Sequence, residues 1–182
     1  NQINFLIKSN ANLSIIFCFL KKKIFKILNK NKIKNFKREN ELFLKNLKIT
    51  SDYFSSHVFF FYYFLKKFHE LNYLEVGSFE GNSSIFVARK FVNSKIYCVD
   101  NWQGTEEYNN LNFSKIENNF DNNIRNFKKI IKIKSTSDHF FDSNKLSFNL
   151  IYIDGYHLGS QVYKDFKNAW RILCKDGIII LD

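Results

Sequence analysis

Residues 73–84 read YLEVGSFEGNSS, a short apolar run that passes through two glycines into a helical pattern. This order predicts a strand, a tight loop and a helix. Gly77 and Gly81 carry no Cβ and can adopt positive φ angles, so a ligand can lie directly on the loop backbone. The free N–H groups of residues 82–84 can hold a carboxylate or ribose oxygens. The segment therefore predicts either a ligand-binding loop or an ordinary strand-to-helix turn without a ligand.

The charges beside this loop separate two classes of ligand. The dinucleotide fingerprint is G-x-G-x-x-G, whereas Gly77 and Gly81 give the spacing G-x-x-x-G. Glu75 and Glu80 flank the loop, and two carboxylates repel a pyrophosphate but attract an ammonium and a sulfonium. The loop therefore favours S-adenosylmethionine over NAD.

The basic charge of the chain is unevenly distributed. The 182 residues have a net charge of +11, but residues 1–50 contain 12 Lys and Arg against only Glu39 and Glu41. Residues 51–182 hold the other 16 basic and 15 acidic residues and are nearly neutral. We therefore expect a basic, helical N-terminal segment over residues 1–50 and a separate domain over residues 51–182. Because the chain lacks Met and ends in a strand pattern, we expect an internal fragment whose sheet stops after its fifth strand.

The cysteines and the apolar runs bear on the compartment. Cys18, Cys98 and Cys174 are far apart and form no C-x-x-C pattern, which argues against a disulfide framework and against a zinc knuckle. A reducing, cytoplasmic location is therefore expected. No apolar run reaches the ~20 residues of a membrane span. The lysines that accompany residues 14–20 follow this apolar run, which is the reverse of a secretory signal.

Residues 11–48 show an amphipathic helical pattern rich in lysine. Such a helix can contact anionic lipid, nucleic acid or a protein partner. A solvated lysine face that reflects A/T-rich codons explains the same pattern, and we favour it. Nucleic acid and membrane are therefore not expected partners, although peripheral membrane contact stays open. Nothing in the sequence indicates an oligomeric state.

From residue 74 onward, predicted strands and helices alternate. Apolar runs predict strands at 73–76, 95–99, 129–134, 148–154 and after a turn at 175–177, and helical periodicity predicts helices at 83–92, 116–127 and 160–174. Residues 53–70, which precede them, predict a buried aromatic helix. This alternation is typical of an α/β fold with a doubly wound, mostly parallel, Rossmann-like sheet, here preceded by N-terminal helices.

Acidic residues stand where three of these strands end. Asp100 follows the second strand, 19 residues beyond Gly81, where a doubly wound sheet places an acid on the ribose hydroxyls of a nucleoside. An ordinary loop aspartate is the alternative. Glu75 and Asp154 end the first and fourth strands. Because the carboxyl ends of parallel strands share one edge of the sheet, we expect these three acids to form an anionic rim for a cationic nucleoside.

Residues that follow the other strands complete the predicted site. Trp102 either covers the adenine or the acceptor, or packs on the sheet edge. Ser137 or Asp138 can bond the adenine amine at the carboxyl end of the third strand. His157 is either a general base, because an imidazole titrates near neutrality, or a brace for the turn after the fourth strand.

Five segments resemble successive motifs of class I S-adenosylmethionine-dependent methyltransferases. They are EVGSFEGNS from residue 75, YCVDNW from residue 97, STSD from residue 135, IYIDGYH from residue 151 and DFKNAWRILCKDGIIILD from residue 165. The chain most resembles the small-molecule and sugar O-methyltransferase-like branch, whose fourth strand ends in I-D-G-x-H. The resemblance covers residues 51–182 and implies methyl transfer to a hydroxyl of a small-molecule or carbohydrate acceptor. A NAD-dependent oxidoreductase and a non-catalytic nucleoside-binding domain are the alternatives.

The resemblance also implies roles for single residues. Those implied to bind the cofactor are Glu75, Gly77, Ser78 and Gly81 around its methionine part, Asp100 at the ribose, Asn101 and Trp102 beside the adenine, Ser137 and Asp138 at the adenine edge, and Asp154. Asp154 is implied to face the methyl-transfer centre, where His157 is the candidate base. Some family members carry a second acid where this chain has Tyr156.

Metal dependence is a further implication of the resemblance. In metal-dependent members, an acid at the end of the fourth strand and a pair after the fifth strand bind a divalent cation. Asp154 and Asp182 match two of these ligands. Carboxylate oxygens suit Mg²⁺ better than zinc. The expected cofactors are therefore S-adenosylmethionine and, as a candidate, Mg²⁺.

Overall fold

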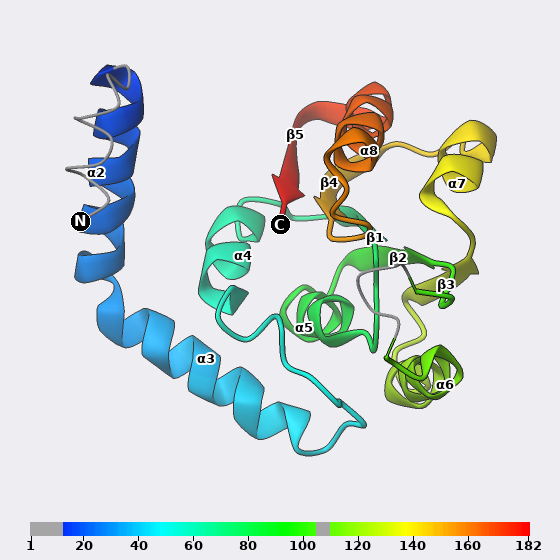
Figure 1. Ribbon diagram of the computed structural model, residues 1–182. Coiled ribbons are helices and arrows are strands. Elements are labelled where there is room, and N and C mark those ends of the chain that lie inside the picture. The colour runs from blue at the N-terminus through cyan, green and yellow to red at the C-terminus, as the bar shows by residue number, and fades with distance from the viewer. Residues whose placement is uncertain (1–12, 105–109) are drawn as a thin grey trace.

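The computed structural model describes residues 13–104 and 110–182. Its centre is one five-stranded sheet in the order β3-β2-β1-β4-β5, and every neighbouring pair is parallel (Figure 1). The strands are β1 (Leu71–Val76), β2 (Ser94–Asp100), β3 (Ile130–Lys134), β4 (Phe148–Ile153) and β5 (Leu173–Leu181). This arrangement confirms the predicted doubly wound, Rossmann-like α/β fold.

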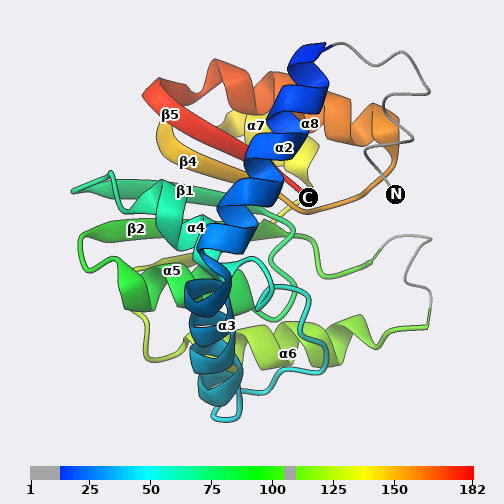
Figure 2. The same ribbon diagram turned by 90° about the vertical axis from the view of Figure 1, so that its left-hand side faces the viewer.

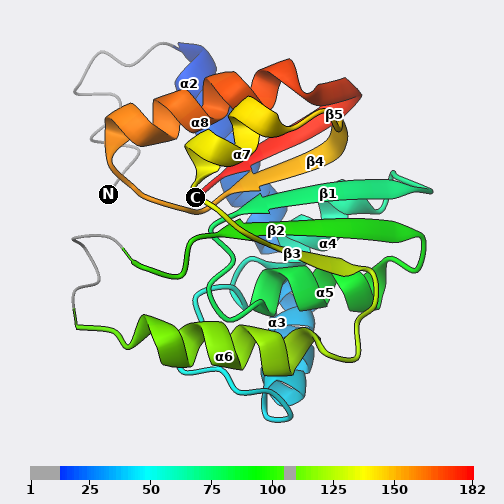
Figure 3. The ribbon, with the colours of Figure 1, turned by 90° about the vertical axis from the view of Figure 1, so that its right-hand side faces the viewer.

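Helices cover both faces of the sheet, as Figures 1 and 3 show. One face carries α4 (Val58–Leu65), α5 (Asn82–Lys90) and α6 (Phe113–Ile124), and the other carries α7 (Ser137–Ser143) and α8 (Gly159–Arg171). Each face has its own apolar core, since alternate residues of a strand point to opposite sides. On β1, for example, Tyr73 belongs to the first core and Leu74 to the second, and both are fully buried.

The strand order places a switch point between β1 and β4. The chain runs outward from β1 through β2 to β3, and then crosses back to continue with β4 and β5. Ligands of open parallel sheets bind beside the carboxyl ends of the strands at such a point. The loops after β1 and β4 meet there, because the N–H of Asp154 donates to the carbonyl of Val76 at 2.8 Å.

The N-terminal helices lie on the outer side of α4 (Figure 2). The single helical stretch predicted over residues 11–48 is two helices, α2 (Leu13–Leu28) and α3 (Lys30–Leu44). Asn29 separates them, and its side-chain amide donates to the carbonyl of Phe25 at 2.9 Å. Polar side chains that bond the local backbone in this way compete with continuous helix. Within the described ranges, none of the helices has the length and apolar character needed to cross a bilayer.

The aromatic helix predicted over residues 53–70 is shorter than expected. Only α4 is helical, because Asp52 accepts bonds from the N–H groups of Phe54 and Ser55 and holds a turn before it. The prediction that this helix packs on the sheet is confirmed. The ring of Phe61 meets that of Tyr152 on β4 edge-on, with centroids 4.9 Å apart.

The last helix and strand also differ from the predicted boundaries. α8 ends at Arg171 rather than at residue 174, and β5 begins before the predicted turn, which forms an irregularity within the strand. The inner face of α8 is also different. The helical periodicity of residues 160–174 predicts an inner face that includes Trp170, but Trp170 is 65% exposed, whereas Asp165 is buried. Asp165 is buried because Gln161, one turn earlier, donates to its carboxylate at 3.0 Å.

Candidate active site

A cavity of about 540 Å³ lies at the carboxyl ends of β1, β2 and β4. It is open on one side and takes its lining from the loops that follow the strands. The predicted site residues that line it are Gly77, Asp100, Asn101, Ser137, Asp138, Asp154, His157 and Asp182. Eight of the predicted site residues therefore surround the same cavity. Its size suits a nucleoside-sized ligand.

The loop after β1 has the left-handed backbone that its glycines predict. Gly77 and Gly81 have φ angles of +87° and +84°. A Cβ on Gly77 would lie 2.1 Å from the carbonyl oxygen of Asp154, so only glycine fits between the two loops. Phe79 also adopts a positive φ, of 47°, which costs energy for a residue with a side chain. A compensating interaction must therefore hold this loop.

Asp100 supplies that interaction. One of its carboxylate oxygens accepts bonds from the N–H groups of Ser78 and Phe79, at 2.9 and 3.0 Å, and the other accepts from Trp102 at 2.8 Å. Burial raises the pKa of Asp100, and these backbone bonds oppose the rise because they favour the charged form. Asp100 thus shapes the loop and also lines the cavity.

Glu75 lies behind the loop rather than on the rim of the cavity. It is fully buried, and the hydroxyls of Ser83 and Ser84 donate to its carboxyl group. Burial raises the pKa of Glu75 to about 8, against the opposing effect of these hydroxyl bonds. The expectation of three charged acids on one rim is therefore corrected, because Glu75 is neutral at pH 7 and does not line the cavity.

Glu80 also points away from the cavity. It is buried, and its carboxylate accepts bonds from the N–H of Thr50 at 2.6 Å and from the amide of Asn119 at 2.8 Å. From the sequence, Glu80 was expected to act as a charge that a bound ligand feels directly. That expectation is wrong, because the carboxylate joins α6 and the segment before α4 to the loop.

Three further predicted residues support the loop without lining the cavity. Trp102 is buried, its indole N–H donates to the carbonyl of Phe79 at 2.9 Å, and its ring packs on Phe120 with centroids 4.8 Å apart. Of the placements expected for Trp102, the structure shows packing against the protein. Ser78 is 3% exposed and acts through its N–H, while Gly81 lies against the ring of Phe120.

The adenine end predicted from the sequence is a network of side chains. Ser137 begins α7 after the cap residue Thr136, whose hydroxyl accepts the N–H of His139. The amide of Gln161 donates to Ser137 and to Asp138, at 3.2 Å each. Lys164 lies 2.7 Å from the second oxygen of Asp138 and lowers the pKa of that carboxyl group. Helix α8 thus orients both predicted residues.

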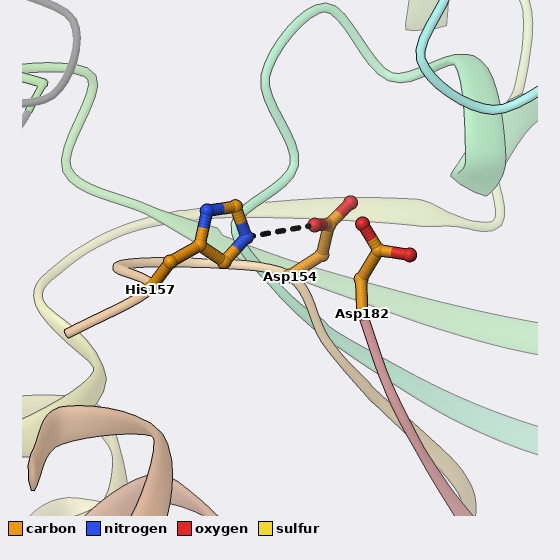
Figure 4. A group of neighbouring side chains, drawn as sticks. All are labelled: Asp154, His157 and Asp182. Carbon is orange, nitrogen blue, oxygen red and sulfur yellow. Dashed lines mark ion pairs between the residues drawn. The ribbon is translucent and has the colours of Figure 1, made fainter. Parts of the chain in front are cut away.

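Asp154 and His157, which follow β4, lie beside Asp182, which follows β5 (Figure 4), and all three line the cavity. The Nε2 atom of His157 lies 3.5 Å from one oxygen of Asp154, and the hydroxyl of Tyr152 donates to the other at 2.8 Å. Burial, helped by the negative charge of Asp182, raises the pKa of Asp154 to about 6, against the opposing effects of Tyr152 and His157. An imidazole beside a mostly ionised carboxylate is a suitable proton acceptor.

These three side chains also fit a divalent cation. Each offers one ligand atom, and the three atoms lie within 4.8 Å of one another. Two carboxylates are ligands that Mg²⁺ accepts, and the imidazole extends the set to transition metals. The predicted metal ligands Asp154 and Asp182 are therefore close enough to share an ion.

The sequence did not identify several residues of this site. Tyr53 and Phe79 line the cavity and meet edge-on, with ring centroids 5.8 Å apart. No ligand spacing in the sequence includes His57, which predicts that it serves local backbone, but its Nδ1 lies 3.5 Å from Asp182. Gln161 also lines the cavity. Only Phe79 had a usable signal, its place between Gly77 and Gly81, because the others come from segments far from the glycine loop.

The comparisons agree with this geometry. A family profile described as "Methyltransferase domain" matches residues 74–182, which is more than half of the chain. No curated protein matches the sequence. Among solved structures, a candidate caffeoyl-CoA O-methyltransferase from Staphylococcus aureus has a TM-score of 0.56 and 18% identity, over 90% of this chain and 73% of that one.

Two other solved structures are similar. A precorrin-6y C5,15-methyltransferase from Geobacter metallireducens has a TM-score of 0.56 and 14% identity, over 74% of this chain and 65% of that one. An O-methyltransferase from Bacillus cereus in complex with SAH has a TM-score of 0.53 and 18% identity, over 84% and 66%. The chain thus spans about two thirds of the length of these two proteins. At such identities the likeness shows the fold alone.

Proposed function

This chain belongs to the family of class I methyltransferase domains, and from that premise we propose that it transfers a methyl group from S-adenosylmethionine to a hydroxyl oxygen of a small-molecule or carbohydrate acceptor. The family identified from the sequence motifs is thereby confirmed. The observation that carries the proposal is the cavity lined both by Asp100, at the end of β2, and by the Asp154–His157 pair, which follows β4 on the other side of β1. Methyl transfer to a hydroxyl requires a site that binds the nucleoside part of the methyl donor and a group that accepts the hydroxyl proton.

In this proposal the cofactor binds along the loops at the switch point of the sheet. Asp100 receives the ribose hydroxyls, since a carboxylate accepts two hydroxyl protons at once. The backbone at Gly77 would hold the methionine part, and Asn101 with Ser137 and Asp138 would border the adenine, since all four residues line the cavity. The residues behind the loop, Glu75, Ser78, Gly81 and Trp102, would hold it in place. Asp154 would supply a negative charge that attracts the sulfonium.

The proposed reaction consists of one displacement at the methyl carbon and one proton transfer. The acceptor oxygen forms a bond to the methyl carbon as the carbon–sulfur bond breaks, and the electron pair of that bond stays on sulfur. The hydroxyl proton passes to His157, whose imidazolium is stabilised by Asp154 at 3.5 Å. Alignment of the oxygen behind the methyl carbon supplies much of the acceleration, and the base supplies a further ~10²–10⁴-fold.

A divalent cation, Mg²⁺ by preference, is part of the proposal. Asp154 and Asp182 would hold it, and its charge would lower the pKa of an acceptor hydroxyl bound beside them. Titration with Mn²⁺ followed by electron paramagnetic resonance tests this directly. Binding that weakens at least about tenfold in Asp182→Asn supports the site, and equal binding in the variant rejects it.

Calorimetry separates the proposed cofactor from the alternatives. We expect the chain to bind S-adenosylhomocysteine and to bind NAD at least about tenfold more weakly. The reverse preference would favour the oxidoreductase alternative. The negative charge and ribose contacts of Asp100 predict that Asp100→Asn weakens S-adenosylhomocysteine binding, whereas Asp121→Asn, an exposed acid on α6, leaves it unchanged.

Transfer itself is tested with labelled S-adenosylmethionine and phenolic and carbohydrate acceptors. Asp154→Asn should lower the rate at least about 100-fold while the affinity for S-adenosylhomocysteine changes little. Asp121→Asn again serves as the control. Binding of S-adenosylhomocysteine without transfer to any hydroxyl would favour the non-catalytic nucleoside-binding alternative.

A further inference from the structure

The described part of the N-terminal segment carries an unbroken run of positive charge. Residues 21–38 contain nine Lys and Arg and no acid, and all nine side chains are exposed. They are Lys21, Lys22, Lys23, Lys26, Lys30, Lys32, Lys34, Lys37 and Arg38. We call this surface, on the second half of α2 and the first half of α3, the basic face. Figures 1 and 2 show that these helices form the outermost layer on their side of the molecule.

Large aliphatic side chains stand among these cations. Ile24, Ile27 and Leu28 are 55%, 65% and 78% exposed. The inward side of the same helices is occupied by aromatic contacts with α4. Phe25 meets Tyr63 and Phe36 meets Tyr62, with ring centroids 4.9 Å apart in each case. Phe25 and Phe36 therefore hold the helices on α4, while Ile24, Ile27 and Leu28, with the lysines that flank them, are exposed to solvent.

Codon usage alone does not explain this face. The same nucleotide bias acts on residues 51–182, yet those residues hold 16 basic and 15 acidic side chains. Residues 21–38 combine the absence of acids with exposed aliphatic groups. A/T-rich codons favour both lysine and isoleucine, but they do not predict that these side chains are exposed together on the same two helices.

We propose that the basic face docks on an anionic lipid surface, with Ile24, Ile27 and Leu28 entering the boundary between headgroups and acyl chains. Lysines around a few aliphatic anchors are the composition of helices that lie in a membrane interface, where lipid charge attracts the cations and apolar burial retains the helix. This docking leaves the helices on the surface of the bilayer. It is independent of the proposed methyl transfer.

Lipid fits this surface better than the other polyanion, nucleic acid. Ile24, Ile27 and Leu28 gain nothing from a phosphate backbone, and the aromatic rings that stack bases are engaged elsewhere, since Phe25 and Phe36 pack on α4. A second copy of the chain also fits poorly, because the two basic faces would repel each other.

Co-sedimentation with vesicles tests the proposal. The chain should sediment with phosphatidylcholine vesicles that contain phosphatidylserine, and binding to phosphatidylcholine alone should be at least about tenfold weaker. The combined variant Ile24→Ser, Ile27→Ser and Leu28→Ser should lose binding to the anionic vesicles. The matched control, Val92→Ser with Leu146→Ser, changes aliphatic groups that are 83% and 47% exposed elsewhere, and should bind as the unchanged chain does.

The charges are tested in the same assay. Lys21→Glu with Lys23→Glu, which flank Ile24, Ile27 and Leu28 around α2, should abolish vesicle binding, whereas Lys95→Glu with Lys145→Glu, the same change away from the basic face, should weaken it only slightly. Equal binding to neutral and anionic vesicles overturns the proposal. Tighter binding to an RNA oligonucleotide than to the vesicles also overturns it, as does self-association that the triple serine variant abolishes.

Discussion

The N-terminal helices and the loop after β1 belong to the same chain and reflect the same codon usage, yet they are stabilised in different ways. α2 is attached on one side through aromatic contacts such as Phe25 on Tyr63, and its lysines remain in water. In the loop, Ser78 and Glu80 are buried, and backbone N–H groups are bonded to Asp100. Tolerance to substitution should therefore differ sharply between the two regions.

The segment between the two regions belongs to the site as much as to the helices. Thr50 bonds to Glu80, the carboxylate of Asp52 accepts the amide of Asn82 at 2.9 Å, and Tyr53 lines the cavity. The division between residues 1–50 and 51–182 stays a prediction, but the bond from Thr50 to Glu80 crosses it. A variant that starts at residue 51 would remove a partner of Glu80.

Gly77→Ala should have the largest effect. The added Cβ would lie 2.1 Å from the backbone of Asp154 and the residue would be held at a φ of +87°, so both loops must move. We expect the free energy of unfolding to fall by at least about 4 kcal/mol, measured by urea denaturation. Gly159→Ala is the control, because a Cβ there meets no atom within 4 Å and should cost less than about 1 kcal/mol. Similar losses of stability in the two variants would contradict the close approach of the loops after β1 and β4.

Glu75→Gln should change how stability depends on pH. With a folded-state pKa of about 8 and an ordinary value of 4.5, Glu75 keeps its proton on folding while the unfolded chain loses it. Its contribution is therefore fully present below about pH 4.5 and is lost as the pH rises through 8. A tenfold difference in proton affinity corresponds to roughly 1.4 kcal/mol. The free energy of unfolding of the unchanged chain should therefore fall by a few kcal/mol through this group as the pH rises from about 4.5 to 8.

Urea denaturation at pH 5 and at pH 8.5 measures this difference. The Glu75→Gln variant should show a flatter profile than the unchanged chain, because glutamine has no proton to lose. Parallel profiles would mean that Glu75 is ionised in the folded protein. The assignment of a neutral carboxyl group behind the loop would then be wrong.

Glu80→Ala should have an intermediate effect. It leaves the N–H of Thr50 and the amide of Asn119 without their partner, at a cost of about 2 kcal/mol by denaturation. Affinity for S-adenosylhomocysteine should fall as well, since the loop loses its connection to α6. Glu39→Ala removes a carboxylate that is 52% exposed and paired with Lys90, and should cost less than about 1 kcal/mol. Equal costs for the two variants would contradict a specific role for Glu80.

Leu28→Ala should have the smallest effect on stability. The side chain is 78% exposed, so its removal should change the free energy of unfolding by less than about 0.5 kcal/mol. The same substitution should reduce binding to anionic vesicles. A large loss of stability would show that this side of α2 is packed against protein, and would remove the basis for lipid docking.

Much of the fold could be predicted because its signals are local. Apolar runs such as residues 148–153 and the glycines at 77 and 81 fix strands and turns by their own conformational preferences, and alternation with helices predicts a parallel sheet. Asp100 and Asp154 were found for the same reason, since a residue that ends a parallel strand must lie at the ligand-binding edge. Helix ends were less predictable, because Asn29 and Asp52 act through side-chain bonds to nearby backbone.

The sequence by itself determined the doubly wound sheet, the family and the acids at the strand ends, because these depend on periodicity and on the order of motifs along the chain. Only the tertiary structure decided that Glu75 and Glu80 face inward, that Tyr53 lines the cavity and His57 contacts Asp182, and that the aliphatic groups of α2 face water. The physical reason is that burial and partners are supplied by residues distant in sequence. A carboxylate becomes a neutral brace or a charged ligand according to what packs around it.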